Sequence, residues 1–315
     1  MYVASCPLRI SLFGGSTDNP FFVKKYGYGS VISFASNLKT YISLHKDMLG
    51  YNVYGGKFIV NYSKREEIDS ISKIINDPVR LVFEYFNIEP LTVSLNSDSY
   101  SQGSGLASSS SYIISLIKAI SLYKKIKMTP MEICDLAYKL ELQINPYCGY
   151  QDPYGCGIGG LKRIEFFNDK SIKYEFLETN FFNYYDAHLI FTGVTRNSRN
   201  VLKDISENIE KSKPLLDTLE QAYSEFKKEN FDKFLELLNV SWIQKKNTSE
   251  IISSNDIIKE MDKEITNNNS IIAHKLCGAG NGGFFLVFSE KNKLNIPFDK
   301  VKISVATDGV RGHTL

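Results

Sequence analysis

Apolar and polar residues are arranged along the first hundred positions in the manner of β-strands. An apolar run at Leu8–Phe13 ends at two glycines, and a second run follows at 31–34. Residues 51–62 alternate apolar side chains with polar ones or glycine, which predicts a hairpin that turns at Gly55-Gly56. Leu91–Leu95 alternates strictly and predicts another strand. The start of the chain is therefore expected to be rich in strands.

Two helices are predicted after these strands. Apolar residues within 107–125 fall on one stripe at helical spacing. The second helix is expected to begin at Thr129, because Thr129 and Glu132 form a capping box and Pro130 occupies the first helical position. Pro146 is expected to end this helix.

The second half of the chain carries longer helical periodicity. A segment rich in glycine and proline at 146–160 is predicted to be a loop. Helical stretches are expected between about residues 200 and 264, interrupted by Pro214. Short apolar runs predict further strands at 164–167, 172–176, 187–191 and 284–288. The composition turns helix-rich near residue 180, which predicts a domain boundary there, with 1–180 before it and 181–315 after it.

Composition narrows the possible classes of protein. Of the 315 residues, 43% are hydrophobic and 23% are charged, as in a soluble globular protein and unlike a disordered, collagen-like or coiled-coil chain. Lys and Arg number 37 against 35 Asp and Glu, which argues against nucleic acid as a partner. No apolar run reaches the roughly 18–20 residues that span a bilayer, so no membrane partner is expected.

Cysteine and histidine usage points to a reducing compartment. The five cysteines are odd in number and scattered without a C-x-x-C pair, and the four histidines show no spacing of a metal pair. The N-terminus has no basic segment followed by a long apolar one, so no signal peptide is predicted. These features predict a cytoplasmic protein without a disulfide framework or a cysteine-based zinc site.

Three glycine clusters lie beside predicted strand ends or helix starts, at 14–15, 103–105 and 278–283. The middle cluster, within Ser101–Ser110, is placed between a strand and a helix. Glycines allow such a loop to fold tightly, so that several main-chain N–H groups and the positive end of the helix dipole face one anion. The loop is therefore a candidate for binding a phosphate chain, with its serine hydroxyls on phosphate or Mg²⁺; an ordinary serine helix cap is the alternative.

Two common nucleotide signatures are excluded. The middle cluster lacks the lysine of a Walker A loop, and Ser108 stands where G-x-G-x-x-G requires its third glycine. Gly278, Gly280 and Gly283 do match G-x-G-x-x-G, but a strand is predicted to follow them, whereas a dinucleotide site needs a helix there. The third cluster is otherwise explained as a hairpin turn.

Three charged residues are candidates for chemistry. Asp152 lies in the predicted loop, where a carboxylate can act as base for a hydroxyl nucleophile, although an ordinary loop aspartate is the simpler explanation. Glu141, on the preceding helix, is either a metal ligand or a solvated side chain. Arg9 lies within an apolar strand, and a buried arginine needs an anion such as Asp152 or a phosphate.

The chain resembles the GHMP kinases, whose three sequence motifs are similar, in this order, to Pro7–Ile10 with Gly14–Asp18, Gly103–Ser109 and Gly278–Gly283. The resemblance spans nearly the whole chain. It implies an α+β fold of two domains, an S5-domain-2-like N-terminal domain for ATP and substrate (1–180) and a ferredoxin-like C-terminal domain (181–315). The first motif reads GG-x-TD and, together with Thr192–Arg196, is most similar to the heptose 7-phosphate kinase and fucokinase branch. The motifs depart from the usual pattern at Ser101, Pro153, Cys277 and Asn281.

The resemblance implies roles for individual residues. Asp152 matches the catalytic aspartate, Arg9 the basic residue paired with it, and Glu141 a glutamate that binds Mg²⁺. One serine of Ser108, Ser109 and Ser110 would be the other metal contact, with Ser109 favoured. The nucleotide loop would consist of Gly103, Ser104, Gly105, Leu106, Ala107, Ser108, Ser109 and Ser110. Substrate contacts would come from Gly15, Thr17, Asp18 and Asp152, and the C-terminal glycine loop would supply Gly278, Ala279, Gly280 and Gly282.

The activity that the resemblance implies is transfer of the γ-phosphoryl group of ATP, with Mg²⁺, to a sugar hydroxyl. The expected acceptor is the anomeric hydroxyl of a heptose 7-phosphate or related sugar, on the way to a nucleotide-activated sugar. Two alternatives stay open: a regulator that binds sugar and nucleotide without turnover, and a kinase for a non-sugar alcohol. A sugar that already carries a phosphate would need extra basic groups, for which the candidates are Lys162, Arg163, Arg196 and Arg199. None of these patterns indicates an oligomeric state.

Overall fold

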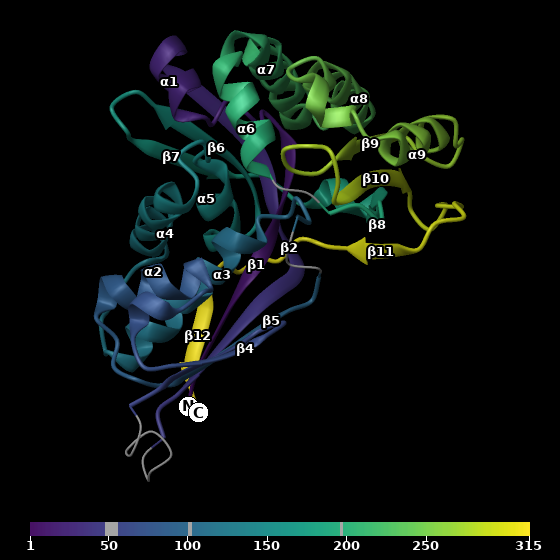
Figure 1. The fold of residues 1–315 in the computed structure, drawn as a ribbon. Coiled ribbons are helices and arrows are strands. Elements are labelled where there is room, and N and C mark those ends of the chain that lie inside the picture. Colours follow the sequence, from purple (N-terminus) through teal and green to yellow (C-terminus); the bar gives the residue numbers. More distant parts are fainter. Residues whose placement is uncertain (48–55, 100–102, 196–197) are drawn as a thin grey trace.

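Two long strands organise the start of the chain. The computed structural model describes residues 1–47, 56–99, 103–195 and 198–315. β1 (Tyr2–Phe13) pairs antiparallel with β2 (Tyr28–His45) along nearly its whole length (Figure 1). β2 is long enough to pair with one strand through its first half and with another through its second half. The two strands therefore form the spine of the first sheet.

The first sheet is completed by strands from both ends of the chain. These are β3 (Phe58–Asn61), β4 (Arg65–Ile68), β5 (Thr92–Ser97), β6 (Leu161–Phe167), β7 (Ile172–Phe176) and β12 (Arg311–Thr314). Their order is β12-β1-β2-β5-β3-β4, with β6 and then β7 added on the first half of β2. β12 lies beside β1, and the two termini meet in Figure 1. The domain boundary near residue 180 stays a prediction, and β12 is an element beyond it that joins the N-terminal strands.

The second sheet lies in the later part of the chain. Its antiparallel strands are β8 (Tyr185–Phe191), β9 (Ala273–Leu276), β10 (Phe284–Glu290) and β11 (Lys300–Ile303), in the order β11-β8-β10-β9. Helices connect β8 to β9, as in the ferredoxin-like arrangement that was expected. Residues 291–299 connect β10 to β11 without a helix, because Asn292 adopts a left-handed conformation and Pro297 follows.

Helices cover both sheets. Those of the N-terminal part are α1 (Pro20–Tyr26), α2 (Asp77–Phe86), α3 (Ser108–Tyr123), α4 (Pro130–Ile144) and α5 (Gln151–Gly157). Those of the C-terminal part are α6 (Ser198–Glu207), α7 (Lys213–Lys227), α8 (Phe231–Lys246) and α9 (Asp256–Thr266). Short 3-10 helices occupy Ile71–Lys73, Asn180–Asn183, Ile209–Ser212 and Glu250–Ser253. None of the helices among the described residues is both long and apolar enough to cross a bilayer.

Two large hydrophobic cores hold these layers together. One lies between the first sheet and helices α2 to α4, where Val82 and Ile117 pack with Val93. The other joins the two sheets to helices α7 and α8 and contains Phe34, Phe234 and Phe288. Because α7 and α8 pack against the first sheet as well as the second, side chains from the C-terminal part reach the N-terminal glycine motifs.

The local patterns predicted most helices and strands correctly. α3 and α4 are confirmed, and α4 begins with the capping box between Thr129 and Glu132. Pro214 was expected to interrupt the helices and lies in the first turn of α7, where proline is tolerated. The hairpin predicted at 51–62 is wrong where it can be tested: residues 51–55 lie outside the described part, and β3 pairs with β4 around a turn at 62–64.

Candidate active site

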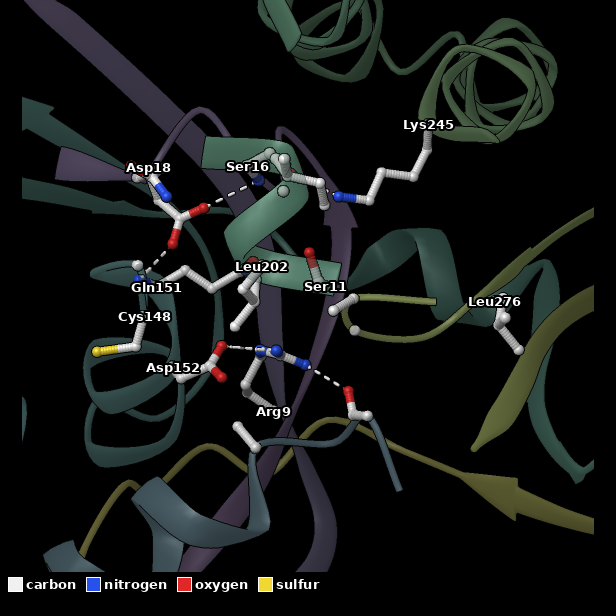
Figure 2. Close-up of a pocket in the computed structure, with 18 of the residues that line it drawn as sticks. Arg9, Ser11, Ser16, Asp18, Cys148, Gln151, Asp152, Leu202, Lys245 and Leu276 are labelled. Atoms are coloured by element: carbon white, nitrogen blue, oxygen red, sulfur yellow. Dashed lines mark hydrogen bonds and ion pairs between the residues drawn. The ribbon is translucent and has the colours of Figure 1, made fainter. Parts of the chain in front are cut away.

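A pocket of about 190 Å³ forms where the three glycine motifs meet. The first motif contributes Gly15, Ser16 and Asp18, and the C-terminal loop contributes Gly278 and Ala279. The serine-rich loop lines it with Gly103, Ser104, Gly105, Ala107, Ser108 and Ser109. Arg9 and Asp152 also line the pocket, together with side chains from α6, α7 and α8 (Figure 2). Segments far apart in sequence thus converge on one small space.

Arg9 and Asp152 form the ion pair at the centre of the pocket. Asp152 Oδ1 accepts from Arg9 Nε at 2.9 Å and from Nη2 at 2.6 Å, while Nη1 donates to the carbonyl of Gly105 at 2.8 Å. The Arg9 side chain is 3% exposed and that of Asp152 is 38% exposed. Burial alone would lower the pKa of Arg9, but the charge and hydrogen bonds of Asp152, together with smaller contributions from nearby cysteines, outweigh it and raise this pKa. The guanidinium therefore stays charged and fixes one oxygen of the carboxylate.

Asp152 lies in the first turn of helix α5, and not in a loop as predicted. Two glycines of this helix, Gly155 and Gly157, lie where a side chain would collide with its neighbours, so they allow the helix to pack closely. A Cβ on Gly155 would lie 3.1 Å from the Arg9 side chain, and one on Gly157 would lie 2.3 Å from Cys134 Sγ. Close tertiary packing thus outweighs the poor helix propensity of glycine.

Asp18 caps the helix that carries Asp152. Its Oδ2 accepts from the main-chain N–H of Gln151 at 2.9 Å, and its Oδ1 accepts from that of Ser16 at 3.0 Å. A Cβ on Gly149 would lie 2.0 Å from Oδ2, so only glycine fits there. Burial raises the pKa of Asp18, while the N–H of Gln151 opposes the rise. Asp18 therefore links the first motif to α5 in addition to lining the pocket.

The serine-rich loop has the shape expected of an anion site. Gly103, Gly105 and Ala107 have positive φ angles of 70°, 78° and 60°, after which α3 begins at Ser108. Ser104 Oγ and Ser108 Oγ are hydrogen-bonded at 2.9 Å. Leu106 is fully buried in the core, so it anchors the loop. The positive end of the long α3 dipole thus faces the same pocket as Arg9.

Glu141 is buried beneath this loop, and it is Ser110 that contacts it. Ser110 Oγ donates to Glu141 Oε1 at 2.5 Å, whereas Ser109 is exposed to the pocket. Burial and the nearby charge of Asp152 raise the pKa of Glu141 to about 8. Its Oε2 is buried and has no hydrogen-bond partner among the residues that the structure describes.

This orphaned carboxylate oxygen fits a divalent cation. A bound cation would supply the charge that Oε2 otherwise lacks. Across the described ranges, no group of three or more His, Cys, Asp or Glu residues is placed to hold a metal ion. Mg²⁺ commonly takes one or two protein ligands and completes its shell with phosphate oxygens and water, so Glu141 and a serine are sufficient.

The remaining residues of the first and third glycine motifs shape the backbone around the pocket. Thr17 is fully buried, and its hydroxyl oxygen lies 2.8 Å from the carbonyl oxygen of Gly14 and 2.7 Å from that of Ser30. A Cβ on Gly280 would lie 2.6 Å from the side chain of Ile252. Gly282 has a φ of 143°. Cys277 is buried before the loop, and β10 follows it as predicted, so no helix N-terminus is present there.

Two buried lysines of the pocket had not been predicted. Lys275, on β9, donates to the carbonyl of Leu12 at 2.7 Å, and burial lowers its pKa to about 8. A lysine within an apolar strand was a signal of the same kind as Arg9. Lys245, on α8, reaches the pocket from a helix whose pattern alone gave no such signal.

Of the four basic residues proposed to bind the phosphate of a sugar, two make other contacts in the structure. Lys162 is fully buried and donates to the carbonyls of Gly155 and Gly160, and Arg163 pairs with Glu220. Arg199 is exposed, and Arg196 and Ser101 lie outside the described residues. The spacing of charges in the sequence could not reveal which of them face the pocket.

A second cavity, of about 740 Å³, opens between the end of β5, the first turns of α3 and the second sheet. It is lined by Leu95–Ser99, which lead toward the loop, and by Tyr112, one turn into α3. Leu38, Tyr62 and Phe284 add apolar surface. The combination of apolar walls and polar strand-end atoms is typical of a small-molecule site.

Comparison with known proteins agrees with this geometry. The sequence model of the GHMP kinases N terminal domain matches residues 73–160. The chain is 29% identical to the D-glycero-alpha-D-manno-heptose 7-phosphate kinase of Campylobacter jejuni, over 91% of this chain and 89% of that one. A solved D-glycero-D-manno-heptose 1-phosphate kinase from Bacteriodes thetaiotaomicron has a TM-score of 0.78 at 18% identity, covering 100% of this chain and 99% of that chain. Lactococcus lactis galactokinase complexed with galactose has a TM-score of 0.74 at 17% identity, covering 98% and 94%.

The matched segment contains the serine-rich loop, Glu141 and Asp152, and the likeness in fold extends over the whole chain. Residues 73–160 are therefore similar in sequence to the N-terminal domain of the GHMP kinases, and the whole chain shares their fold.

Proposed function

We propose that this chain is an ATP-dependent sugar kinase, which transfers the γ-phosphoryl group of ATP to a hydroxyl of a sugar. One observation carries the proposal. Asp152 has Oδ1 held by Arg9, while Oδ2 has no hydrogen-bond partner among the described residues, and both side chains line the pocket of the serine-rich loop. A carboxylate held in this way beside an anion site suits a reaction between a hydroxyl and a phosphate.

Asp152 acts as the base. Its Oδ2 accepts the proton of the acceptor hydroxyl as the new oxygen–phosphorus bond forms. At the same time the bond between the γ-phosphorus and the bridging oxygen breaks, and ADP leaves. Arg9 holds the carboxylate in place and places positive charge beside the moving phosphoryl group. Phosphoryl transfer depends mainly on such positioning and charge stabilisation.

The serine-rich loop binds the phosphate chain. Main-chain N–H groups at the start of α3 and the helix dipole face the phosphates, and the second cavity takes the nucleoside. Glu141, with Ser109 or Ser110, would hold Mg²⁺. A bound Mg²⁺ supplies positive charge that neutralises the phosphates.

The acceptor lies on the other side of Arg9 from this loop, beside Asp18. We propose the anomeric hydroxyl of a heptose 7-phosphate or related sugar as the acceptor, because the Campylobacter jejuni relative is a heptose 7-phosphate kinase. The pocket is lined by both parts of the chain, and a bound acceptor would displace water, which would otherwise accept the phosphoryl group.

The test is a measurement of ADP release over a panel of acceptors, with ³¹P NMR to locate the new phosphate. The panel contains D-glycero-D-manno-heptose 7-phosphate, mannose, fucose, galactose and mevalonate. We expect turnover with a sugar and a new anomeric phosphate. Sugar-dependent shifts in melting temperature without ADP release would identify a binding protein instead, and turnover of mevalonate alone would identify a kinase for a non-sugar alcohol.

A further inference from the structure

Lys245 connects helix α8 to the first glycine motif. Its Nζ donates to Ser16 Oγ at 2.5 Å, although the two residues are 229 positions apart. The residue is only 8% exposed, yet it lines the pocket. Ser241, one turn earlier on the same helix, lines the pocket as well. The C-terminal part of the chain therefore places an ammonium group inside the acceptor side of the site.

Ser16 is held in an unusual backbone conformation at this contact. Its φ is +89°, a backbone angle that residues other than glycine rarely adopt. The main-chain N–H of Ser16 donates to Asp18 Oδ1, so the strained turn is fixed from two sides. Strain of this kind is retained where the surrounding structure over-determines it, and it is concentrated at functional sites.

Lys245 lies at the end of the pocket remote from the nucleotide loop. In Figure 2, Arg9 and Asp152 lie between two groups. On one side Arg9 donates to the carbonyl of Gly105, in the nucleotide loop, and on the other side lie Asp18, Ser16 and Lys245. An acceptor whose reacting hydroxyl contacts Asp152 would thus extend its far end toward Lys245.

Across the whole pocket, basic side chains outnumber acidic ones by one. Three basic side chains line it, Arg9, Lys245 and Lys275, against the two acidic ones, Asp18 and Asp152. Arg9 is paired with Asp152, and Lys275 donates to a main-chain carbonyl. A lysine ammonium carries three N–H donors, so Lys245 can contact Ser16 and a ligand oxygen together.

We propose that Lys245 and the Ser16 hydroxyl bind a phosphate group that the acceptor sugar already carries, and so select sugar phosphates over free sugars. This inference rests on the proposed function, because it assigns the far end of the same acceptor. The phosphate accepts hydrogen bonds from the ammonium and the hydroxyl group, while the sugar hydroxyl at the opposite end reacts beside Asp152.

The experiment compares sugars with and without a phosphate at the far end. The pairs are D-glycero-D-manno-heptose 7-phosphate with the free heptose, and mannose 6-phosphate with mannose. Turnover and calorimetric binding are measured for the wild type, Lys245→Met and Lys245→Arg. Lys233→Met serves as the control, because Lys233 is an exposed lysine of the same helix that pairs with Glu236.

We expect Lys245→Met to weaken binding and kcat/KM for the sugar phosphates by about 10- to 100-fold, as for a lost charged hydrogen bond. In the same variant, the KM for ATP and the kcat/KM for free sugars, which is lower in the wild type, should each change by less than about threefold. Lys245→Arg should retain most of the binding, and Lys233→Met all of it.

Several results would overturn this assignment. The first is a wild-type protein that binds a free sugar and its phosphate equally well. The second is a Lys245→Met variant in which binding of the free sugar and of its phosphate falls equally, and the third is a Lys245→Met variant in which neither falls. A wild type that binds the sugar phosphates through Lys245 but releases no ADP would contradict the proposed kinase activity and leave this binding site supported. A wild type that phosphorylates only free sugars would support the proposed kinase activity and contradict this phosphate-binding site.

Discussion

Gly283 packs directly against the carbonyl group of Ser104, so that a Cβ placed on Gly283 would lie 2.3 Å from that oxygen. The two residues belong to the third and second glycine motifs, and Gly283 also has a φ of +95°. The main-chain N–H of Gly283 donates to the carbonyl of Val194, and its own carbonyl accepts from Thr192. The C-terminal loop thus supports the nucleotide loop from behind.

Gly283→Ala is expected to push the Ser104 carbonyl away and raise the KM for ATP by about 10-fold, since overpacking a fixed contact costs roughly 1–3 kcal/mol. Gly193→Ala is the matched control. Gly193 has a similar φ of +73° and lies nearby in the chain before Val194, but nothing lies within 4 Å of its Cβ position. The measurement is steady-state kinetics with varied ATP. An equal rise in the KM for ATP in both variants would contradict a role for the contact between Gly283 and Ser104.

Asp152→Asn is expected to lower kcat by about 10²–10⁴, because the amide cannot accept the hydroxyl proton. Binding of ATP, measured by calorimetry, should be largely kept. Asp169→Asn makes the same charge change in a surface turn, where Asp169 contacts Ser171. An Asp152→Asn enzyme that turns over sugar at the wild-type rate would show that another group is the base.

Glu141→Gln is expected to raise the Mg²⁺ concentration needed for half-maximal activity by about 10-fold or more, since a charged ligand is lost. Binding of ADP in the presence of Mg²⁺ should weaken, while binding of ADP without metal should not. Glu84→Gln is the control, because it removes the same negative charge on the exposed face of α2. If Mg²⁺ strengthens ADP binding equally in Glu141→Gln and wild type, Glu141 is not a metal ligand.

Asp18→Ala is expected to lower kcat as well as raise the KM for the sugar, because Asp18 both lines the pocket and caps α5, which carries Asp152. Loss of such a cap typically costs about 1 kcal/mol of stability. The melting temperature should therefore fall together with activity. A change in sugar KM with kcat and melting temperature intact would mean that the capping contact has no consequence.

Asp262 is expected to stabilise the C-terminal part of the chain in a pH-dependent way. It accepts from Trp242 Nε1 and Lys246 Nζ, each at 2.7 Å, and contacts His274 Nε2 at 2.9 Å. Burial works to raise the pKa of Asp262, but the hydrogen bonds of His274, Lys246 and Trp242 outweigh it and lower the pKa to about 2. Because the folded pKa lies below the ordinary value of 3.8, the stabilisation is complete above pH 4 and is lost as pH falls toward 2.

Asp262→Ala should therefore reduce the free energy of unfolding by about 2 kcal/mol at neutral pH, as for hydrogen bonds to a charged group. The difference from wild type should shrink between pH 4 and pH 2. Urea unfolding across this range is the measurement, with Asp256→Ala, an exposed residue of the same helix, as control. A difference that does not change with pH would exclude this carboxylate as its source.

The local pattern of apolar and capping residues was sufficient to predict two helices that carry residues of the site. The apolar stripe after Ala107 and the capping box at Thr129 predicted α3 and α4, because helix formation depends on neighbours three or four positions apart. Arg9 within an apolar strand indicated a buried charge with an anionic partner, and the structure pairs it with Asp152. The order and spacing of the glycine motifs indicated the family.

Other features depended on contacts between distant segments. Helix α5 forms from a glycine- and proline-rich stretch because Asp18 caps it and Arg9 and Cys134 leave no room for side chains on Gly155 and Gly157. Ser110 contacts Glu141 because of where α3 packs on α4, and the choice of Ser109 as the metal contact stays a prediction.

The sequence by itself therefore determined helices α3 and α4, the three glycine motifs and the need of a buried Arg9 for an anionic partner. Only the tertiary structure decided which side chains meet in the pocket, since Lys245 and Ser16 meet across 229 positions and Arg9 and Asp152 across 143. Propensity and periodicity act over one or two turns of backbone, whereas the surroundings of a buried charge are set by the packing of whole helices and sheets.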